Sequence, residues 1–260
     1  MNLESAPKYG YNYFIMEKKP HCIVVGDIQT NCWLYPLDEI TLGDSLVQQV
    51  PGFETLAANE GGKQPCVIID PGDDADLIVS RIGELNWFPL FIFLTHGHLD
   101  HISALPDIME AYCDYNPPMV GIHRLDAKYL GKDSLCVHRE SLRPAGGSAF
   151  ADALWKPMPD ADLLFDEGDR AGPFIILHLR GHTPGSVGFF DEKNNILFSG
   201  DTLFRGDWGR TDLSGGSESQ IRQSLKRLLS MEGEISVFPG HGPTTTIKEE
   251  KGLMGNHAFP

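Results

Sequence analysis

The sequence predicts an α+β domain in which two β-sheets pack together and are covered by helices. Apolar segments of strand length are mixed with amphipathic helical segments along the chain, and both halves show the same strand-then-helix rhythm. The apolar fraction of 41%, with 28 glycines and 18 prolines, is typical of a globular, loop-rich protein and not of a coiled coil or a disordered chain. Residues 1–260 are enough to bury one large core, and we expect a single domain.

In the first half, short apolar runs ended by turn residues predict strands at 22–26, 31–35, 66–69, 90–94 and 119–122. Leucine and isoleucine at helical spacing predict helices over 76–85 and 102–112, the second with a late start or a kink at Pro106. Residues 1–20 are expected to form an irregular lead-in. Residues 36–64 have a weak pattern, which predicts an excursion or an extra hairpin.

In the second half, prolines and glycines with little periodicity between them predict a long loop region at about 130–168. Such a loop is often placed beside an active site. Turn residues then bound strands predicted at 174–179, 186–190, 195–199 and 235–238, and an apolar stripe predicts a helix over 217–231.

Charge and cysteine content exclude several classes of protein. The formal charge of −15 repels nucleic-acid phosphates, although a dication and a few local arginines can still admit a small anionic substrate. The five scattered cysteines form no Cys-x-x-Cys pair and suggest no disulfide framework. No segment approaches the ~18 apolar residues of a membrane helix. We therefore expect a cytoplasmic protein, a monomer or small homo-oligomer, with no nucleic-acid or membrane partner.

One short stretch concentrates residues that bind metals. His96, His98, Asp100 and His101 fall within six positions, directly after the apolar run 90–94. Imidazole nitrogen and carboxylate oxygen are ligands that zinc, iron and manganese accept. A surface loop that is merely rich in histidine is the alternative. Four ligand-type residues at the rim of a core favour a metal site instead.

Three further ligand-type residues follow predicted strands at equivalent positions. His182, Asp201 and His241 each come after an apolar strand and a glycine. One such residue alone would be weak evidence, because a solitary histidine usually has a structural role. Together they are expected to converge on one edge of the sheets.

The pattern His96-x-His98-x-Asp100-His101, followed by His182, Asp201 and His241, is similar to the five-part motif of the metallo-β-lactamase fold. The resemblance extends from the turn at Asp70-Pro71-Gly72 to His241. It implies a four-layer αββα sandwich of two mixed sheets, with a two-metal site along their shared edge. Carried over residue by residue, one metal would be held by His96, His98 and His182, the second by Asp100, His101 and His241, and Asp201 would bridge them.

These roles imply hydrolytic chemistry. Two divalent ions ~3.5–4 Å apart can share a hydroxide, lower its pKa and polarise a carbonyl, so Asp100 and Asp201 would hold the nucleophile in place. Zinc is the expected metal, with iron or manganese as alternatives. Asp70 would accept a hydrogen bond from a ligating histidine, as family members suggest, or would simply be a turn residue.

The finer resemblance is to the glyoxalase II branch, the hydroxyacylglutathione hydrolases. It is carried by the stretches around Gly200–Phe204, Gly209–Asp212 and Pro239–Thr244. It implies a thioesterase that cleaves S-(2-hydroxyacyl)glutathione or a related thioester. Arg210 would then anchor a substrate carboxylate, or else form a surface salt bridge, and Arg205 and Trp208 would line the pocket.

The sequence also departs from that branch. Fewer than twenty residues follow His241, so we expect a short form without the C-terminal helical domain of the larger enzymes. One alternative is a persulfide dioxygenase with a single iron on His96, His182 and Asp201. A lactonase on the same scaffold and a non-enzymatic, metal-stabilised interaction module are the others.

Overall fold

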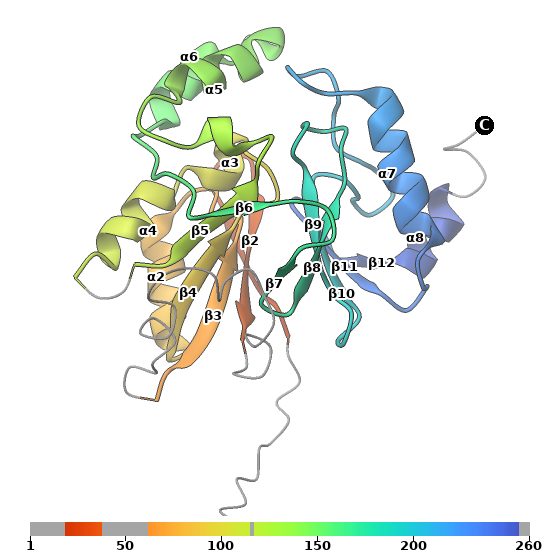
Figure 1. Ribbon diagram of the computed structural model, residues 1–260, viewed down its shortest axis with the longest axis horizontal. Helices are drawn as coiled ribbons and strands as arrows, with labels where there is room; N and C mark the ends of the chain where they lie inside the picture. Colours follow the sequence, from red (N-terminus) through yellow and green to blue (C-terminus); the bar gives the residue numbers. More distant parts are fainter. Residues whose placement is uncertain (1–18, 38–61, 115–116, 255–260) are drawn as a thin grey trace, which may run out of the picture.

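A computed structural model describes residues 19–37, 62–114 and 117–254. Within these ranges two six-stranded sheets pack face to face, and helices cover both outer faces (Figure 1). The fold is therefore the four-layer αββα sandwich that the resemblance implied. None of the helices in these ranges is long and apolar enough to cross a bilayer.

The first sheet contains the strands of the N-terminal half. In spatial order they are β1 (His21–Val25), β2 (Thr30–Pro36), β3 (Gln64–Ile69), β4 (Trp87–Phe93), β5 (Met119–His123) and β6 (Leu163–Phe165). The pairs from β1 to β3 are antiparallel and those from β3 to β6 are parallel. Its outer face carries α2 (Ala75–Glu84), α3 (Leu99–Ile102) and α4 (Leu105–Ala111).

The second sheet contains the strands of the C-terminal half. Their order is β12 (Thr245–Thr246), β11 (Ser236–Pro239), β10 (Ile196–Gly200), β9 (Val187–Asp191), β8 (Phe174–His178) and β7 (Arg170–Ala171). Only β10 and β11 pair in parallel. The helices α7 (Glu218–Ser230) and α8 (Ile247–Met254) lie on its outer face (Figure 1).

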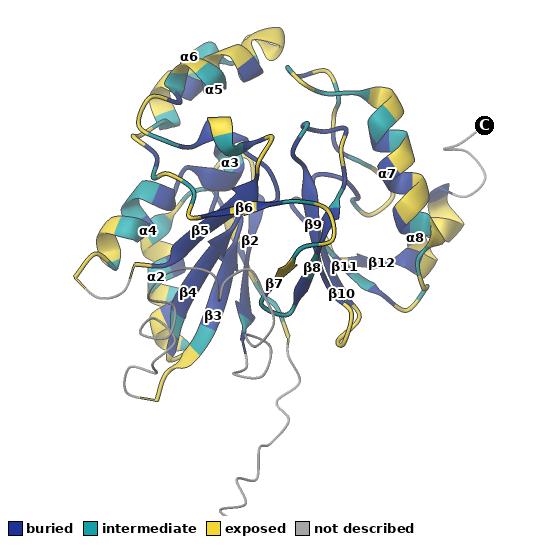
Figure 2. Ribbon diagram, viewed as in Figure 1, coloured by how far each residue is buried: buried dark blue, intermediate teal, exposed yellow. Residues whose placement is uncertain are grey.

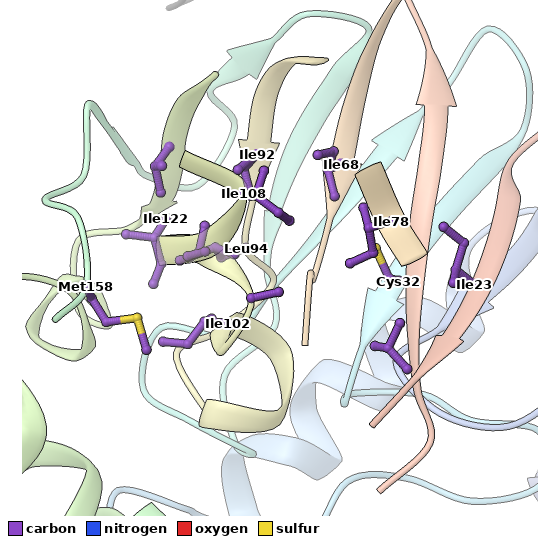
Figure 3. Close-up of a cluster of buried hydrophobic side chains, with 14 of the residues drawn as sticks. Ile23, Cys32, Ile68, Ile78, Ile92, Leu94, Ile102, Ile108, Ile122 and Met158 are labelled. Carbon is purple, nitrogen blue, oxygen red and sulfur yellow. The ribbon is translucent and has the colours of Figure 1, made fainter. Parts of the chain in front are cut away.

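Apolar side chains pack between the two sheets and between each sheet and its helices. Between the sheets, aromatic rings such as those of Phe93 and Phe189 pack with centroids 5.5 Å apart. Outside the first sheet, Ile78 of α2 and Ile108 of α4 belong to one buried cluster with Ile68 of β3 and Ile92 of β4 (Figure 3). The central strands are buried on both faces and the helices on one (Figure 2), so the sequences of these strands are nearly continuous apolar runs.

The strands and helices predicted from sequence are present in the described residues, with differences of detail. The helix predicted over 102–112 is α4, and it starts late, at Leu105, with Pro106 in its first turn, where a missing N–H costs no hydrogen bond. The single turn α3 before it was not predicted. The two-residue strands β7 and β12 and the helix α8 were not predicted. Residues 1–18 and 38–61, which hold most of the lead-in and of the 36–64 excursion, lie outside the described residues.

The prediction of a long loop at 130–168 was wrong. This segment contains α5 (Leu135–Leu142), a 3₁₀ turn at Arg143–Ala145, α6 (Ser148–Leu154) and the edge strand β6. The helices are too short for a recognisable apolar stripe, and the proline and glycines between them end one helix and precede the next. An ion pair between Arg139 and Asp152 joins the two helices.

Candidate metal centre

The histidine-rich stretch turns from β4 into α3. Thr95 and His96 form a bend, and His98 has extended backbone with φ −69° and ψ 148°. The segment is thus not one continuous strand. His96 faces His182 through its Nε2 atom, whereas His98 faces His182 through its Nδ1 atom. The first turn of α3 then directs Asp100 and His101 to a second point.

The remaining predicted residues lie at strand ends of the second sheet. Asp201 follows β10, His241 lies two residues after β11, and His182 lies between β8 and β9. Gly200 has φ +50°, and a Cβ at this position would lie 2.4 Å from Thr95 Oγ1. Glycine is required here because the two sheets approach each other so closely.

His96, His98 and His182 form the first group. His182 Nε2 lies 2.9 Å from His98 Nδ1 and 3.2 Å from His96 Nε2. All three rings are buried, and their potential ligand atoms lie within 4.8 Å of one another. The structure therefore assembles the first set of residues that the sequence predicted.

Asp100, His101 and His241 form the second group. The Nε2 atoms of His101 and His241 are 3.2 Å apart. Asp100 Oδ2 lies 3.4 Å from His241 Nε2 and 3.6 Å from His101 Nε2. These atoms converge as closely as those of the first group, so the second predicted set is also assembled.

Asp201 lies between the two groups. Its Oδ2 is 3.6 Å from the Nε2 atoms of both His182 and His241, and its Oδ1 is 3.4 Å from His101 Nε2. Oδ1 is buried and has no hydrogen-bond partner among the described residues. An ionised carboxylate in this position is suited to bridge two cations.

Hydrogen bonds on the outer sides of the rings orient the inner nitrogens. Nδ1 of His182 lies 2.8 Å from the carbonyl oxygen of Arg210, and Nδ1 of His241 lies 3.3 Å from that of Gln29. A carbonyl oxygen can only accept, so the neutral rings carry their proton on Nδ1. The lone pair of each ring is therefore on Nε2 and points into the centre.

His96 also carries its proton on Nδ1, because a neighbouring hydroxyl accepts from that nitrogen. Its Nδ1 is 3.1 Å from Thr95 Oγ1, and that hydroxyl already donates to Asp70 over 2.6 Å. The hydroxyl must therefore accept from Nδ1, which leaves the lone pair on Nε2 of His96. The lone pairs of His96 and His182 face each other at 3.2 Å without a proton between them. Nitrogen and carboxylate donors in this arrangement fit a divalent cation.

The protonation states of the histidines in the centre are also consistent with a bound divalent cation. Burial, with a smaller contribution from His182, lowers the pKa of His98 to about 3, so the ring is in the neutral form that binds metals. Burial also acts against charge on His101, but Asp201 and Asp100 outweigh it and raise the pKa of His101 well above its ordinary value. A positive charge is thus favoured beside these carboxylates, and a bound cation would supply it.

Asp70 holds the centre from outside. It is buried, and its oxygens accept hydrogen bonds from the Thr95 backbone N–H at 2.8 Å and from its hydroxyl. Oδ2 also lies 3.0 Å from Nδ1 of His101. Asp70 lies close enough to His96 and His101 to be a ligand itself, but its oxygens are already engaged by donors. This geometry is that of the orienting role considered from the sequence.

Asp126 was missed from the sequence. It is fully buried, and its oxygens accept from the backbone N–H groups of Gly97 at 3.1 Å and Gly185 at 2.8 Å and from the Thr183 hydroxyl at 2.6 Å. It thereby ties the loop of His96 and His98 to the loop of His182. A lone aspartate after β5 carries no motif, so no sequence signal indicated it.

The residues predicted to contact the substrate lie outside the two groups of metal-binding side chains. The Arg210 guanidinium is exposed and binds Asp212 through two hydrogen bonds of 2.6 and 2.7 Å, which is the salt bridge considered as its alternative role. Arg205 is exposed on the same loop, and Trp208 packs against the core under α7. The buried Glu250 of α8, also missed from the sequence, fixes this loop by accepting from Gly206 N–H at 2.8 Å.

Comparison with known proteins identifies the family. The sequence model of the metallo-β-lactamase superfamily matches residues 58–241, which include the six residues of the two groups and Asp201. The chain belongs to the metallo-β-lactamase superfamily. This superfamily fold implies divalent metals and metal-dependent hydrolysis, and the clustered histidines and aspartates supply donors for such ions.

Relatives in this superfamily differ in their described activities. A hydroxyacylglutathione hydrolase from Haemophilus influenzae is 35% identical over 71% of this chain and 83% of its own length. A probable metallo-hydrolase from Bacillus subtilis is 35% identical over 72% and 84%. Among solved structures, one determined in a di-iron-bound form is 33% identical, covers 91% of this chain and 97% of its own, and has a TM-score of 0.66. A B3 metallo-β-lactamase is 29% identical, with coverages of 90% and 97% and a TM-score of 0.67.

Proposed function

We propose that this metallo-β-lactamase superfamily member is a glyoxalase II-like thioesterase that hydrolyses S-(2-hydroxyacyl)glutathione or a related small thioester. The observation that carries the proposal is the position of Asp201 between two groups of histidine nitrogens. The name of the Haemophilus influenzae relative and the stretch Gly209–Asp212 support the choice of a thioester.

The residues of the centre would bind two metal ions. His96, His98 and His182 would hold one ion, Asp100, His101 and His241 the second, and Asp201 both. The bound ions, which we propose to be two zinc ions, would activate water and polarise the carbonyl of the substrate. The carbonyl oxygens behind His182 and His241 keep the rings in the binding tautomer, so the site needs little reorganisation.

Arg210 lies beside the first group of residues, because its backbone carbonyl oxygen is 2.8 Å from Nδ1 of His182. Arg210 is exposed, so its bond to Asp212 can exchange for a carboxylate of the thiol carrier at small cost. We propose that the thiol carrier lies on this side, with Trp208 supporting the loop.

A combined metal and substrate measurement tests the proposal. We expect close to two divalent ions per chain, together with hydrolysis of S-lactoylglutathione in preference to a lactone or a β-lactam. One iron per chain, with oxygen uptake on glutathione persulfide and no thioesterase activity, would instead establish the dioxygenase alternative. Preferred opening of the lactone would establish the lactonase.

Asp201→Ala tests the bridging role. The variant is expected to lose metal and to lose turnover, because both groups of histidines share this carboxylate. Glu192→Ala, which removes an exposed carboxylate from the β9–β10 turn, is the matched control and is expected to keep both. Full activity of Asp201→Ala would contradict the two-metal arrangement.

A further inference from the structure

A cavity adjoins the centre on the side of Asp100. It is open to solvent, and its enclosed volume is about 40 Å³. Its walls come from the β1–β2 turn, the turn after β3, Asp100 and the inner side of α6. The helices α5 and α6 lie beyond α3 at the end of the first sheet (Figure 1), so α6 forms the outer wall. We call this space the acyl cavity.

The walls of the acyl cavity are largely apolar. Val25 and Ile28 come from the β1–β2 turn, and Phe150 and Leu154 come from α6. Ile28 is 47% exposed although it is a large aliphatic side chain at the tip of a turn. Phe150 and Leu154 are only partly buried. An apolar group that enters this space would remove these side chains from water, which favours binding.

The charged side chains that line the acyl cavity are all carboxylates. They belong to Asp27, Asp73 and Asp100, and no lysine or arginine lines the space among the described residues. Arg210, whose carbonyl oxygen lies 2.8 Å from Nδ1 of His182, is exposed beside the first group of residues instead. An anionic group is therefore repelled from the acyl cavity.

We propose that the acyl cavity binds the acyl group of the substrate and selects an uncharged, apolar acyl chain over one that carries a carboxylate. The inference rests on the proposed thioester hydrolysis. In that reaction the oxygen of water bonds to the carbonyl carbon, the carbon–sulfur bond breaks, and the thiol leaves with a proton. The acyl group lies on the Asp100 side and the anionic thiol carrier on the Arg210 side.

Thioesters of a single thiol test the inference in the metal-loaded enzyme. We expect kcat/KM for hexanoylglutathione to exceed that for succinylglutathione by about tenfold or more, since the two chains differ chiefly by a terminal carboxylate. Leu154→Trp, which fills the cavity, should lower kcat/KM for the hexanoyl ester about tenfold and lower that for the shorter lactoyl ester by less. Leu164→Trp, at an exposed leucine of β6, is the matched control.

Charge reversal provides an arm that does not depend on packing. Asp27 is exposed, so Asp27→Lys is expected to fold and to raise kcat/KM for the succinyl ester severalfold, whereas Glu192→Lys should not. Binding of S-hexylglutathione, measured by calorimetry, should weaken in Leu154→Trp while metal content stays at the unsubstituted level.

The outcomes separate the two proposals. If no thioester is hydrolysed, the proposed function fails. If thioesters are hydrolysed but hexanoyl and succinyl esters react equally, or if Asp27→Lys changes nothing, the assignment of the acyl cavity fails and the thioesterase stands.

Discussion

At the scale of single residues, the centre depends on side chains that do not themselves face it. Asp126 accepts three hydrogen bonds from Gly97, Thr183 and Gly185, and burial raises its pKa in spite of them. It joins two loops that come from different sheets, and each loop carries histidines of the first group. Asp70 accepts hydrogen bonds from Thr95 and lies 3.0 Å from Nδ1 of His101, so it holds the segment after β4 in place.

Asp126→Asn should weaken the hydrogen bonds that connect these two loops. The amide replaces one accepting oxygen by a donor, which leaves a buried N–H or O–H without an acceptor and costs about 1–3 kcal/mol of stability. We expect lower stability in urea unfolding and a loss of metal affinity in competition with a chelator. Asp133→Asn, at an exposed position in the same region, is the control. Unchanged metal affinity of Asp126→Asn would show that the hydrogen bonds of Asp126 do not position the histidines.

At the scale of elements, loops that follow strands determine where the carboxylates and histidines lie. The loop after β10 turns back on itself so closely that a Cβ on Gly209 would lie 1.9 Å from the carbonyl oxygen of Asp201. The same Cβ would lie 3.1 Å from Nδ1 of His182. The glycine before Arg210 is therefore a packing requirement of the centre.

Gly209→Ala is expected to displace the Asp201 backbone. A misplacement of about 1 Å at a reacting group lowers activity on the order of 100-fold. Turnover and metal content should both fall. Gly83→Ala in α2, where no atom lies within 4 Å of the added Cβ, should change neither. Normal activity in Gly209→Ala would mean that the loop can relax without moving Asp201.

The α5–α6 pair has its own dependence on pH. His138 of α5 is buried, with Nε2 2.9 Å from the carbonyl oxygen of Tyr129, and burial lowers its pKa to about 4. The folded state binds fewer protons than the unfolded state, so this contribution is complete above about pH 6.5 and is lost as the pH falls towards 4.

The sign of this effect can be measured with His138→Gln. Between pH 7 and pH 5 the unsubstituted protein should lose about 2 kcal/mol more of its free energy of unfolding than the variant. Urea unfolding at the two pH values gives the comparison, and other histidines such as His123 are common to both proteins. An identical loss in both proteins would contradict the assignment to His138.

At the scale of the whole molecule, the centre joins the two sheets. The first sheet supplies the residues from His96 to His101, and the second supplies His182, Asp201 and His241. Converging lone pairs and carboxylates repel one another unless a cation lies between them. Bound ions therefore stabilise the contact between the sheets in addition to any catalytic role.

Removal of metal should lower the stability of the entire fold. A ligand present at 100 times its Kd contributes about 2.7 kcal/mol to the folded state. Treatment with a chelator should lower Tm by several degrees, and zinc should restore it. The Asp201→Ala variant should show a smaller response, since it has lost the shared carboxylate. No change in Tm on chelation would contradict a metal that links the sheets.

Much of this fold could be predicted because strongly apolar strands and amphipathic helices express their periodicity in the local sequence. The strand at 90–94 and the helix at 217–231 have this property. The short helices α5 and α6 do not, because each has few residues and owes its stability to contact with the other. A local pattern cannot report that contact.

The order of residues shows which chemistry is available here, because ligand-type residues stand directly after apolar strands. The packing of the two sheets establishes which atoms meet. It placed Asp201 between the two histidine groups, added Asp126 behind them, engaged Arg210 with Asp212, and formed the acyl cavity from the β1–β2 turn and α6. These contacts join residues far apart in the chain, and their distances depend on how the two sheets pack.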